Sequence, residues 1–254
     1  MSNWVLKGLR AGIKTGHFGA PTTPGVSPGQ PQGIELSDHA AIALANRCPT
    51  GAIVPHDTGV AIEQRRCVHC MRCLPDRADP SVPWADGFAW AGYASEAAAM
   101  RAKLDRVFRH SLHIRFLDAG ACGACMSEAR QLDNPYYNMH ALGFFITPTP
   151  RNADVLLVAG PVSDATRLPL RKTYDAIPEP KRVVAIGACA ASGGVFGPSF
   201  AAGAGVDEII PVDVIVPGCP PPPLAILHAL LVVVERKPPS KLVTRPADEE
   251  SQTP

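Results

Sequence analysis

The sequence has almost no excess charge, since 24 Lys and Arg residues against 23 Asp and Glu residues leave a net charge of +1 over 254 residues. Such a balance excludes the strongly basic surface with which nucleic-acid-binding proteins neutralise phosphates. Only 19% of the residues are charged and 46% are hydrophobic, so the chain can bury a substantial core. We therefore expect a folded protein without a nucleic-acid partner.

Long hydrophobic runs are also missing. The longest apolar stretches, 155–161 and 224–234, fall short of the roughly 20 residues that a bilayer-spanning helix needs. The first residues contain neither a long apolar segment with a small-residue cleavage site nor a pair of arginines, so we expect no export signal. These absences predict a cytoplasmic protein without a transmembrane helix.

Cysteine, in contrast, is present eight times. In a secreted chain an even number would favour disulfides, but a reducing cytoplasm makes metal or redox chemistry the better interpretation. The spacing of the cysteines divides them into two groups of four. We call these the outer group (Cys48, Cys67, Cys70 and Cys73) and the inner group (Cys122, Cys125, Cys189 and Cys219).

The outer group resembles the ligand set of a bacterial-type ferredoxin. Residues 67–73 form a C-x2-C-x2-C run, which wraps a tight loop around one face of an iron-sulfur cube, and a distant cysteine followed by proline supplies the fourth ligand. Here that pair is Cys48 and Pro49. A second ferredoxin cluster would need four more cysteines, but those positions hold Asp38, Ala41, Leu44 and Arg77. The resemblance implies a small α+β ferredoxin-like domain with one 4Fe-4S cluster.

Zinc is the alternative for the outer group, because four cysteines can also form a structural zinc site. Zinc ribbons prefer two C-x2-C knuckles separated by a loop, whereas three cysteines at successive spacings favour a cluster. His69 lies between the ligands, and we expect it to be a solvated side chain or one that tunes the reduction potential.

Each part of the inner group follows an apolar segment. Such segments precede Cys122, Cys189 and Cys219, and together with 154–162 they predict buried strands of a parallel sheet with helices between them. Loops at the carboxyl ends of such strands form the sites of open α/β sheets, so four cysteines there can converge on one ligand. The alternative is that Cys189 and Cys219 are small buried hydrophobic residues. Neighbouring glycines favour a close backbone approach to a bulky group.

The region 112–234 is similar to the 20 kDa electron-transfer subunit shared by energy-converting nickel-iron hydrogenases and respiratory complex I. The resemblance implies a flavodoxin-like α/β fold, with the inner group holding the proximal 4Fe-4S cluster beside an active site in a large subunit. Cys122 and Cys125 are spaced C-x2-C, which favours the hydrogenase branch over complex I. Pro222 stands where many members have arginine. The matching segments are 118–128, 149–162, 186–197 and 216–227.

Glu128 matches a glutamate of the hydrogenase branch, and we expect it either to relay protons or to charge the first turn of a helix that begins near Met126. Arg151 and Asp154 also match a family segment, but they can equally anchor the strand that follows. We expect His140 and His228 to be ordinary helix or loop residues.

The predicted function is an electron-relay small subunit of a membrane-associated, nickel-iron hydrogenase-type (formate hydrogenlyase-like) complex, with two 4Fe-4S clusters. Its expected partners are a hydrogenase-type large subunit and further electron-transfer and membrane subunits, with no small-molecule substrate of its own. The expected location is cytoplasmic, peripheral on the inner face of the cell membrane. The alternatives are a complex I-like quinone oxidoreductase subunit and a structural zinc-binding interaction protein.

Composition predicts five parts. The basic residues of the N-terminal helix can lie against a membrane surface or against a partner protein. The Pro- and Gly-rich stretch 18–34 should form neither helix nor strand. The parts are 1–34 (N-terminal helix and extended tether), 35–90 (one-cluster ferredoxin-like domain), 91–111 (helical linker), 112–236 (α/β proximal-cluster domain) and 237–254 (tail, disordered over 246–254).

Overall fold

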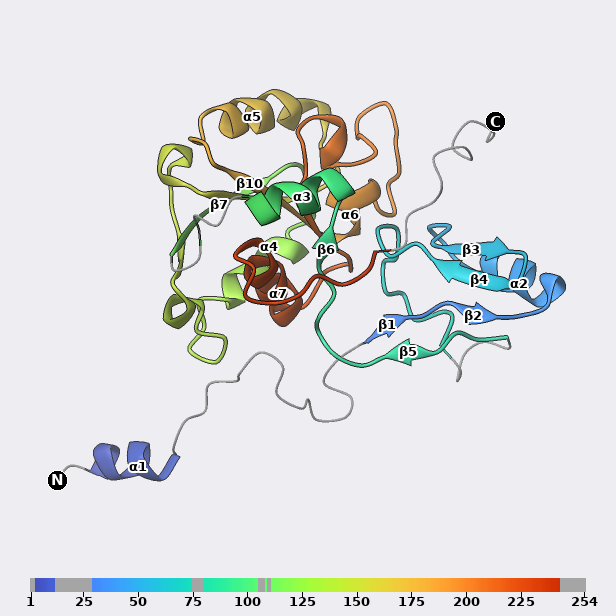
Figure 1. Cartoon of the computed structure of the whole chain (residues 1–254), viewed down its shortest axis with the longest axis horizontal. Helices are drawn as coiled ribbons and strands as arrows, with labels where there is room; N and C mark the ends of the chain where they lie inside the picture. Colours follow the sequence, from blue (N-terminus) through green and yellow to red (C-terminus); the bar gives the residue numbers. More distant parts are fainter. Residues whose placement is uncertain (1–2, 12–28, 75–79, 105–107, 109–110, 243–254) are drawn as a thin grey trace.

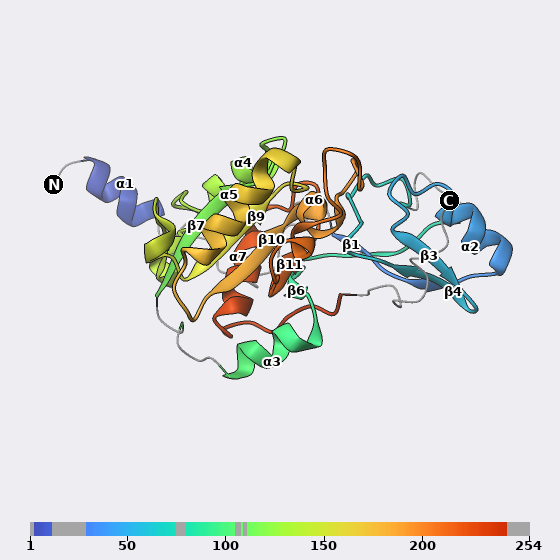
Figure 2. The same ribbon diagram turned by 90° about the horizontal axis from the view of Figure 1, so that it is seen from above.

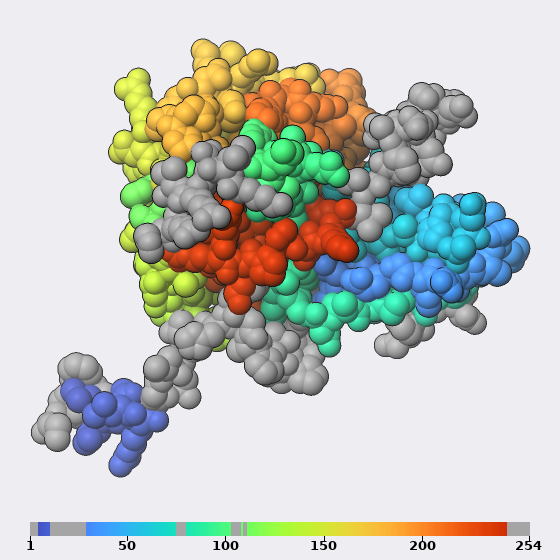
Figure 3. All heavy atoms as spheres, in the orientation of Figure 1, coloured from blue at the N-terminus to red at the C-terminus, as the bar shows by residue number. Residues whose placement is uncertain are grey.

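A computed structural model describes residues 3–11, 29–74, 80–104, 108 and 111–242. Figure 1 shows a larger α/β domain and a small module with its own sheets, and in Figure 3 the small module projects from one side of the larger domain. The N-terminal helix α1 spans Asn3–Ala11, as the sequence predicts. None of the helices in the described ranges has the length and apolar character to cross a membrane.

The larger domain is built on a six-stranded sheet with the order β6-β11-β10-β9-β7-β8. Neighbouring strands from β11 to β8 are parallel, and β6 adds to one edge in the antiparallel direction. Counted along the chain, the parallel strands have the order 2-1-3-4-5 of flavodoxin-like folds. The strands are β6 (Gly92–Tyr93), β7 (Leu112–Asp118), β8 (Phe144–Ile146), β9 (Val155–Ala159), β10 (Arg182–Ile186) and β11 (Val214–Val216).

Helices cover both faces of this sheet (Figure 2). Every residue of β9 and β10 is buried, as expected for parallel strands with helices on each side. One apolar cluster joins a sheet face to α4 and α7, and a second joins the other face to α5 and α6. The helices are α3 (Glu96–Leu104), α4 (Ala124–Gln131), α5 (Asp164–Asp175), α6 (Gly187–Ser192) and α7 (Pro223–Val233), with 3-10 turns η1 (Met139–Leu142), η2 (Pro150–Asn152) and η3 (Val206–Glu208).

The small module contains a three-stranded antiparallel sheet, β2-β4-β3, one helix and a two-stranded ribbon of β1 and β5. Leu44 of the helix is fully buried against the sheet, where it packs with Ile53, Val60 and Ile62. This is an α+β arrangement, and its likeness to a ferredoxin stays a prediction. The elements are β1 (Gln30–Pro31), β2 (Ile34–Glu35), α2 (Asp38–Ala45), β3 (Ile53–His56), β4 (Gly59–Ile62) and β5 (Trp84–Ala85).

Three segments differ from the sequence expectations. The end of the expected tether forms β1 and the first residue of β2, so the prediction that 18–34 holds no strand is wrong at residues 30–31 and 34. The expected linker 91–111 contributes β6 to the large sheet before α3 begins. The first residues of the expected tail follow the same edge, where the Ser240 backbone N–H donates to the Ala91 carbonyl over 2.8 Å. Residues 12–28 of the tether and the tail from 243 onward lie outside the described residues.

Candidate metal centres

The outer group is assembled at one end of the small module's sheet, where the start of β3 pairs with the end of β4. Cys48 follows α2, while the other three lie in the loop after β4, and the four thiols line one pocket together with Trp84 of β5. The loop is curled by two residues in the left-handed region, His69 (φ 51°) and Met71 (φ 61°). All four cysteines are free, so no disulfide competes for their sulfurs.

Electrostatics shows that the outer sulfurs are neighbours. Burial, with smaller contributions from the charges of Cys73, Cys48 and Cys70, raises the pKa of Cys67 to about 12. Burial likewise raises the pKa of Cys73. The Ala52 backbone N–H donates to the Cys48 sulfur over 3.2 Å, which is the kind of contact that stabilises a thiolate.

His69 corrects one expectation. Its ring packs edge-on against Trp90 (centroids 4.6 Å apart) and Trp84 (5.7 Å), so it is not a solvated side chain. Burial lowers its pKa to about 4. Nε2 of His69 is buried without a hydrogen-bond partner in the described part of the chain, whereas the indole N–H of Trp84 interacts with the Cys73 sulfur, whose pKa it lowers. The outer group is therefore bordered by one imidazole nitrogen without a partner among the described residues and by an indole N–H that faces one of its sulfurs.

The inner group gathers at the carboxyl edge of the large sheet, as the sequence predicts. Cys122 lies between β7 and α4, Cys125 is the second residue of α4, Cys189 lies in α6 directly after β10, and Cys219 follows β11. The segments that follow three parallel strands of one sheet, β7, β10 and β11, thus carry the four thiols at the same edge. These thiols are free as well.

The inner sulfurs also interact. The Cys189 thiol donates to the Cys219 sulfur, so the pKa of Cys219 falls to about 6 while the pKa of Cys189 rises. Burial raises the pKa of Cys125 to about 12, with added effects of the Cys219 and Cys122 charges. Burial thus favours the neutral form of these thiols, and a cationic partner would favour the thiolates.

Glycines make room for the inner sulfurs. Gly187, at φ +86°, opens α6, and a Cβ there would lie 2.7 Å from the Cys125 sulfur. Gly194, at φ +61°, ends the same segment, and its Cβ would lie 2.8 Å from the Cys189 sulfur. These two thiols therefore have free space beside them only because glycine, which has no side chain, occupies both neighbouring positions.

Glu128 lies on α4 within electrostatic reach of Cys125, whose pKa it raises. The helix begins at Ala124 rather than near Met126, so Glu128 falls outside the first turn. The alternative that Glu128 charges the first turn is therefore wrong.

The other residues singled out in the sequence have structural contacts. Asp154 accepts a hydrogen bond from the His113 backbone N–H over 2.7 Å and so ties β7 to the start of β9. His228 is buried on α7, where Nδ1 accepts from the Ala91 N–H over 3.1 Å and Nε2 donates to the Pro238 carbonyl over 3.0 Å. His140 instead lies half exposed beside Asp133.

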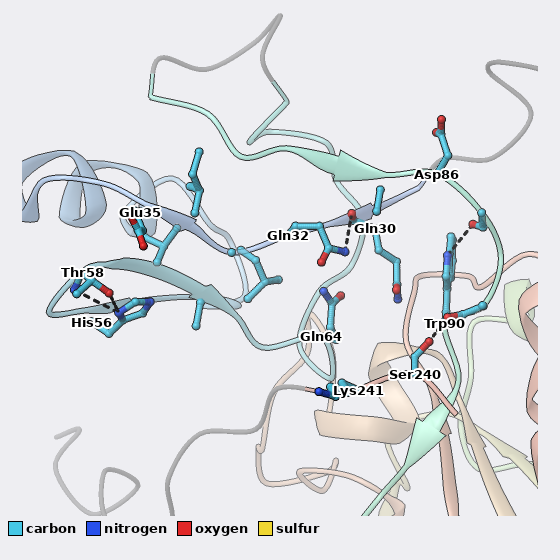
Figure 4. Close-up of a pocket in the computed structure, with 18 residues that line it drawn as sticks. Gln30, Gln32, Glu35, His56, Thr58, Gln64, Asp86, Trp90, Ser240 and Lys241 are labelled. Carbon is cyan, nitrogen blue, oxygen red and sulfur yellow. Dashed lines mark hydrogen bonds between the residues drawn. The ribbon is translucent and has the colours of Figure 1, made fainter. Parts of the chain in front are cut away.

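A larger cavity of about 610 Å³ lies elsewhere on the small module, and no cysteine lines it (Figure 4). The side chains of Gln30 and Gln64 extend into this space from opposite sides, near Trp90 and Lys241. Nε2 of Gln30 and Oε1 of Gln64 have no hydrogen-bond partner among the residues that the structure describes, and both atoms are shielded from solvent. This cavity is therefore separate from the two cysteine groups.

Within the residues that the structure describes, no three His, Cys, Asp or Glu side chains are gathered closely enough to hold a single metal ion.

Two residues near the cysteines were not predictable from the sequence: Arg65, which hydrogen-bonds across to α6, and Trp84, which lines the outer group. Neither residue belongs to a recognisable motif, and only the fold brings Arg65 to α6 and Trp84 to the outer group.

Comparison with known proteins identifies the family. Residues 122–233 match the family described as NADH ubiquinone oxidoreductase, 20 Kd subunit. The chain is 40% identical over 135 residues to a probable membrane-bound hydrogenase subunit of Pyrococcus furiosus, covering 53% of this chain and 81% of that protein. The chain belongs to this family. As a member of the 20 Kd subunit family, it is an oxidoreductase subunit.

Further likenesses cover the same half of the chain. Formate hydrogenlyase subunit 7 of Escherichia coli is 36% identical over 137 residues, which are 54% of this chain and 54% of that protein. Among solved structures, a chain of the archaeal membrane-bound sulfane sulfur reductase has 30% identity and a TM-score of 0.46, covering 53% of this chain and 74% of that chain. All of these alignments leave about half of this chain unmatched.

Proposed function

We propose that the chain is an electron-relay subunit in which each group of four cysteines holds one 4Fe-4S cluster. The observation that carries the proposal is that eight free thiols fall into two sets of four, one lining a single pocket of the small module and the other following β7, β10 and β11 at one edge of the large sheet. Four cysteine thiolates are the usual ligand set of a 4Fe-4S cluster, which supplies reversible one-electron redox chemistry when bound.

The residues beside each group fit a bulky anionic guest. At the outer group, the N–H groups of Trp84 and Ala52 already point to the sulfurs of Cys73 and Cys48, and the buried Nε2 of His69 has no partner among the described residues. At the inner group, Gly187 and Gly194 leave open the space beside the sulfurs. Hydrogen bonds to sulfur and the exclusion of water are the means by which a protein sets a cluster's potential.

The two groups have different roles in the proposal. The inner group stands on the domain that matches the 20 Kd subunit family, so we assign it to the exchange of electrons with a large subunit that carries the active site. The outer group stands on the small module and exchanges electrons with the inner group and with another subunit. The chain then needs no small-molecule substrate of its own.

We assign the chain to a membrane-associated, nickel-iron hydrogenase-type complex resembling formate hydrogenlyase, as a peripheral subunit on the cytoplasmic face. The support is the likeness to a membrane-bound hydrogenase subunit and to formate hydrogenlyase subunit 7, together with the C-x2-C spacing of Cys122 and Cys125. A complex I-like quinone oxidoreductase would use the same relay. Two C-x2-C pairs in the partner large subunit would favour the hydrogenase, and their absence would overturn that assignment while leaving the relay.

Glu128 completes the proposal as a proton-accepting carboxylate near the subunit boundary. It is half-buried, lies near Cys125 and stands outside the first turn of α4. A carboxylate in this position can take up or release a proton when electrons pass the inner group.

The experiment is anaerobic purification followed by iron, sulfide and zinc analysis, with Cys48→Ala and Cys189→Ala as group-specific variants. Two clusters require about eight iron and eight sulfide per chain, and each variant should lose about half of both. A colourless protein with zinc and no acid-labile sulfide would establish the zinc-binding interaction protein instead. About four iron in the unmodified chain would mean that one group has another role.

A further inference from the structure

The turn that leads into Cys67 is a junction between the two parts of the molecule. Within this turn the Cys67 backbone N–H donates to the Gln64 carbonyl over 3.2 Å. Gln64 in turn donates from Nε2 to the Pro31 carbonyl of β1 over 2.8 Å, and Glu63 pairs with Arg66 over 3.8 Å. These contacts stay inside the small module and fix the turn. The side chain between them, Arg65, points to the larger domain instead.

Arg65 makes two contacts with the larger domain. Its Nη2 donates to the Ala191 carbonyl over 3.0 Å and forms an ion pair with the carboxylate of Asp207 in η3. The Arg65 side chain is only 19% exposed. A guanidinium held by a carbonyl and a carboxylate at once is directionally fixed, which a single exposed ion pair is not.

A side chain of the larger domain also hydrogen-bonds to the backbone of Arg65. Ser192 Oγ lies 3.0 Å from the Arg65 carbonyl and 3.1 Å from the Ala188 carbonyl, so its hydroxyl can donate to either. Ala191 and Ser192 are the last two residues of α6, where carbonyl groups carry partial negative charge that a cation complements. Both the side chain and the backbone of Arg65 are therefore bonded to the end of α6.

The same short segments carry the cysteines. Arg65 is two residues before Cys67 of the outer group, and Ala191 is two residues after Cys189 of the inner group. A single 3.0 Å hydrogen bond thus joins the two peptide segments that present these thiols. No other role is evident for a half-buried arginine in this place, since its turn is already fixed by Gln64 and Glu63.

We infer that Arg65 is a positioning residue that sets the separation and relative orientation of the outer and inner groups. The inference rests on the proposed function, because it concerns electron exchange between the two clusters. Electron tunnelling slows steeply as the distance between carriers grows, so a relay built on two covalently linked modules needs a contact that stops them from hinging. Arg65, Asp207 and Ser192 provide that contact beside the thiols.

The test compares Arg65→Met with Arg66→Met in the full-length chain. Arg66 is a matched control because it lies in the same turn and pairs with Glu63 of its own module. In the fully reduced protein, Arg65→Met should keep the iron and sulfide content of the unmodified chain, lose the magnetic interaction between the two clusters in EPR spectra, and slow electron exchange between them. Arg66→Met should keep both. Arg65→Lys, which retains the charge, should recover part of the interaction.

Hydrogen exchange gives a second readout that needs no iron. The amides of residues 188–193 should exchange faster in Arg65→Met and in Ser192→Ala than in Arg66→Met. Faster exchange in an iron-free protein would support the contact while the proposed function fails. Two clusters whose magnetic interaction and exchange rate are unchanged in Arg65→Met would overturn the inference while leaving the proposed function intact. If Arg65→Met does not fold, the same comparisons with Asp207→Asn and Ser192→Ala decide in the same way.

Discussion

Replacement of Gly187 by alanine tests whether the inner group depends on space beside Cys125. Gly187 has φ +86°, which costs a residue with a side chain about 1–2 kcal/mol. Its Cβ would stand 2.7 Å from the Cys125 sulfur, and overpacking of this kind costs about 1–3 kcal/mol. We therefore expect Gly187→Ala to lower the free energy of unfolding by about 2–5 kcal/mol, a large part of the stability of a typical domain.

Gly123→Ala is the matched control, because Gly123 has φ +90° but no atom within 4 Å of its added Cβ. Gly123→Ala therefore measures the cost of the backbone strain without the steric contact that Gly187→Ala adds at the Cys125 sulfur. Gly123 is also the N-cap of α4, so its replacement includes any loss of capping, and the difference between the two variants is a lower bound on the effect of the contact.

The assay is anaerobic urea unfolding of both variants under reducing conditions, followed by circular dichroism, with iron analysis of the folded proteins. Gly187→Ala should unfold at lower urea than Gly123→Ala and lose iron from the inner group, since its methyl group displaces the Cys125 sulfur. Equal stability and full iron content in both variants would refute the reasoning that a closely packed backbone shapes the inner site.

Two further predictions concern titratable groups. Burial lowers the pKa of His228 below its ordinary 6.5, so the unfolded chain binds the proton more tightly and stability should fall as the pH drops below about 6.5. Urea unfolding at several pH values should show a weaker pH dependence in His228→Gln, and identical slopes would contradict this. Glu128→Gln should lower the hydrogen turnover of the assembled complex without changing its iron content, whereas Asp133→Asn should not, and unchanged turnover in Glu128→Gln would exclude a proton-relay role.

The sequence predicted the strands with strong apolar patterns and missed the short ones. β9 and β10 are five-residue runs in which every side chain is buried, so hydrophobicity alone reveals them. β6 has only two residues and pairs with β11, which lies about 120 residues further along the chain. β1 contains a proline at a sheet edge, where the missing N–H is tolerated. Such strands form because tertiary contacts favour them over local preference.

The candidate site was also predictable only in part. The cysteine spacings and their place after apolar strands predict two groups of four thiols, and that each group holds a cluster stays a prediction. The burial of His69 was not predictable, because Trp84 and Trp90 reach it from a separate strand and the loop after it. Arg65 looks like part of a charged turn in the sequence, and only the docking of the small module beside α6 gives it partners.

The central claim is that two separate sets of four thiols each hold a redox-active cluster. Spin quantitation by EPR of the anaerobically purified, dithionite-reduced chain tests it most directly. The account predicts about two spins per chain in two distinguishable 4Fe-4S signals, one lost in Cys48→Ala and the other in Cys189→Ala. A single signal that disappears in both variants, or no signal in a protein that contains zinc, would contradict it.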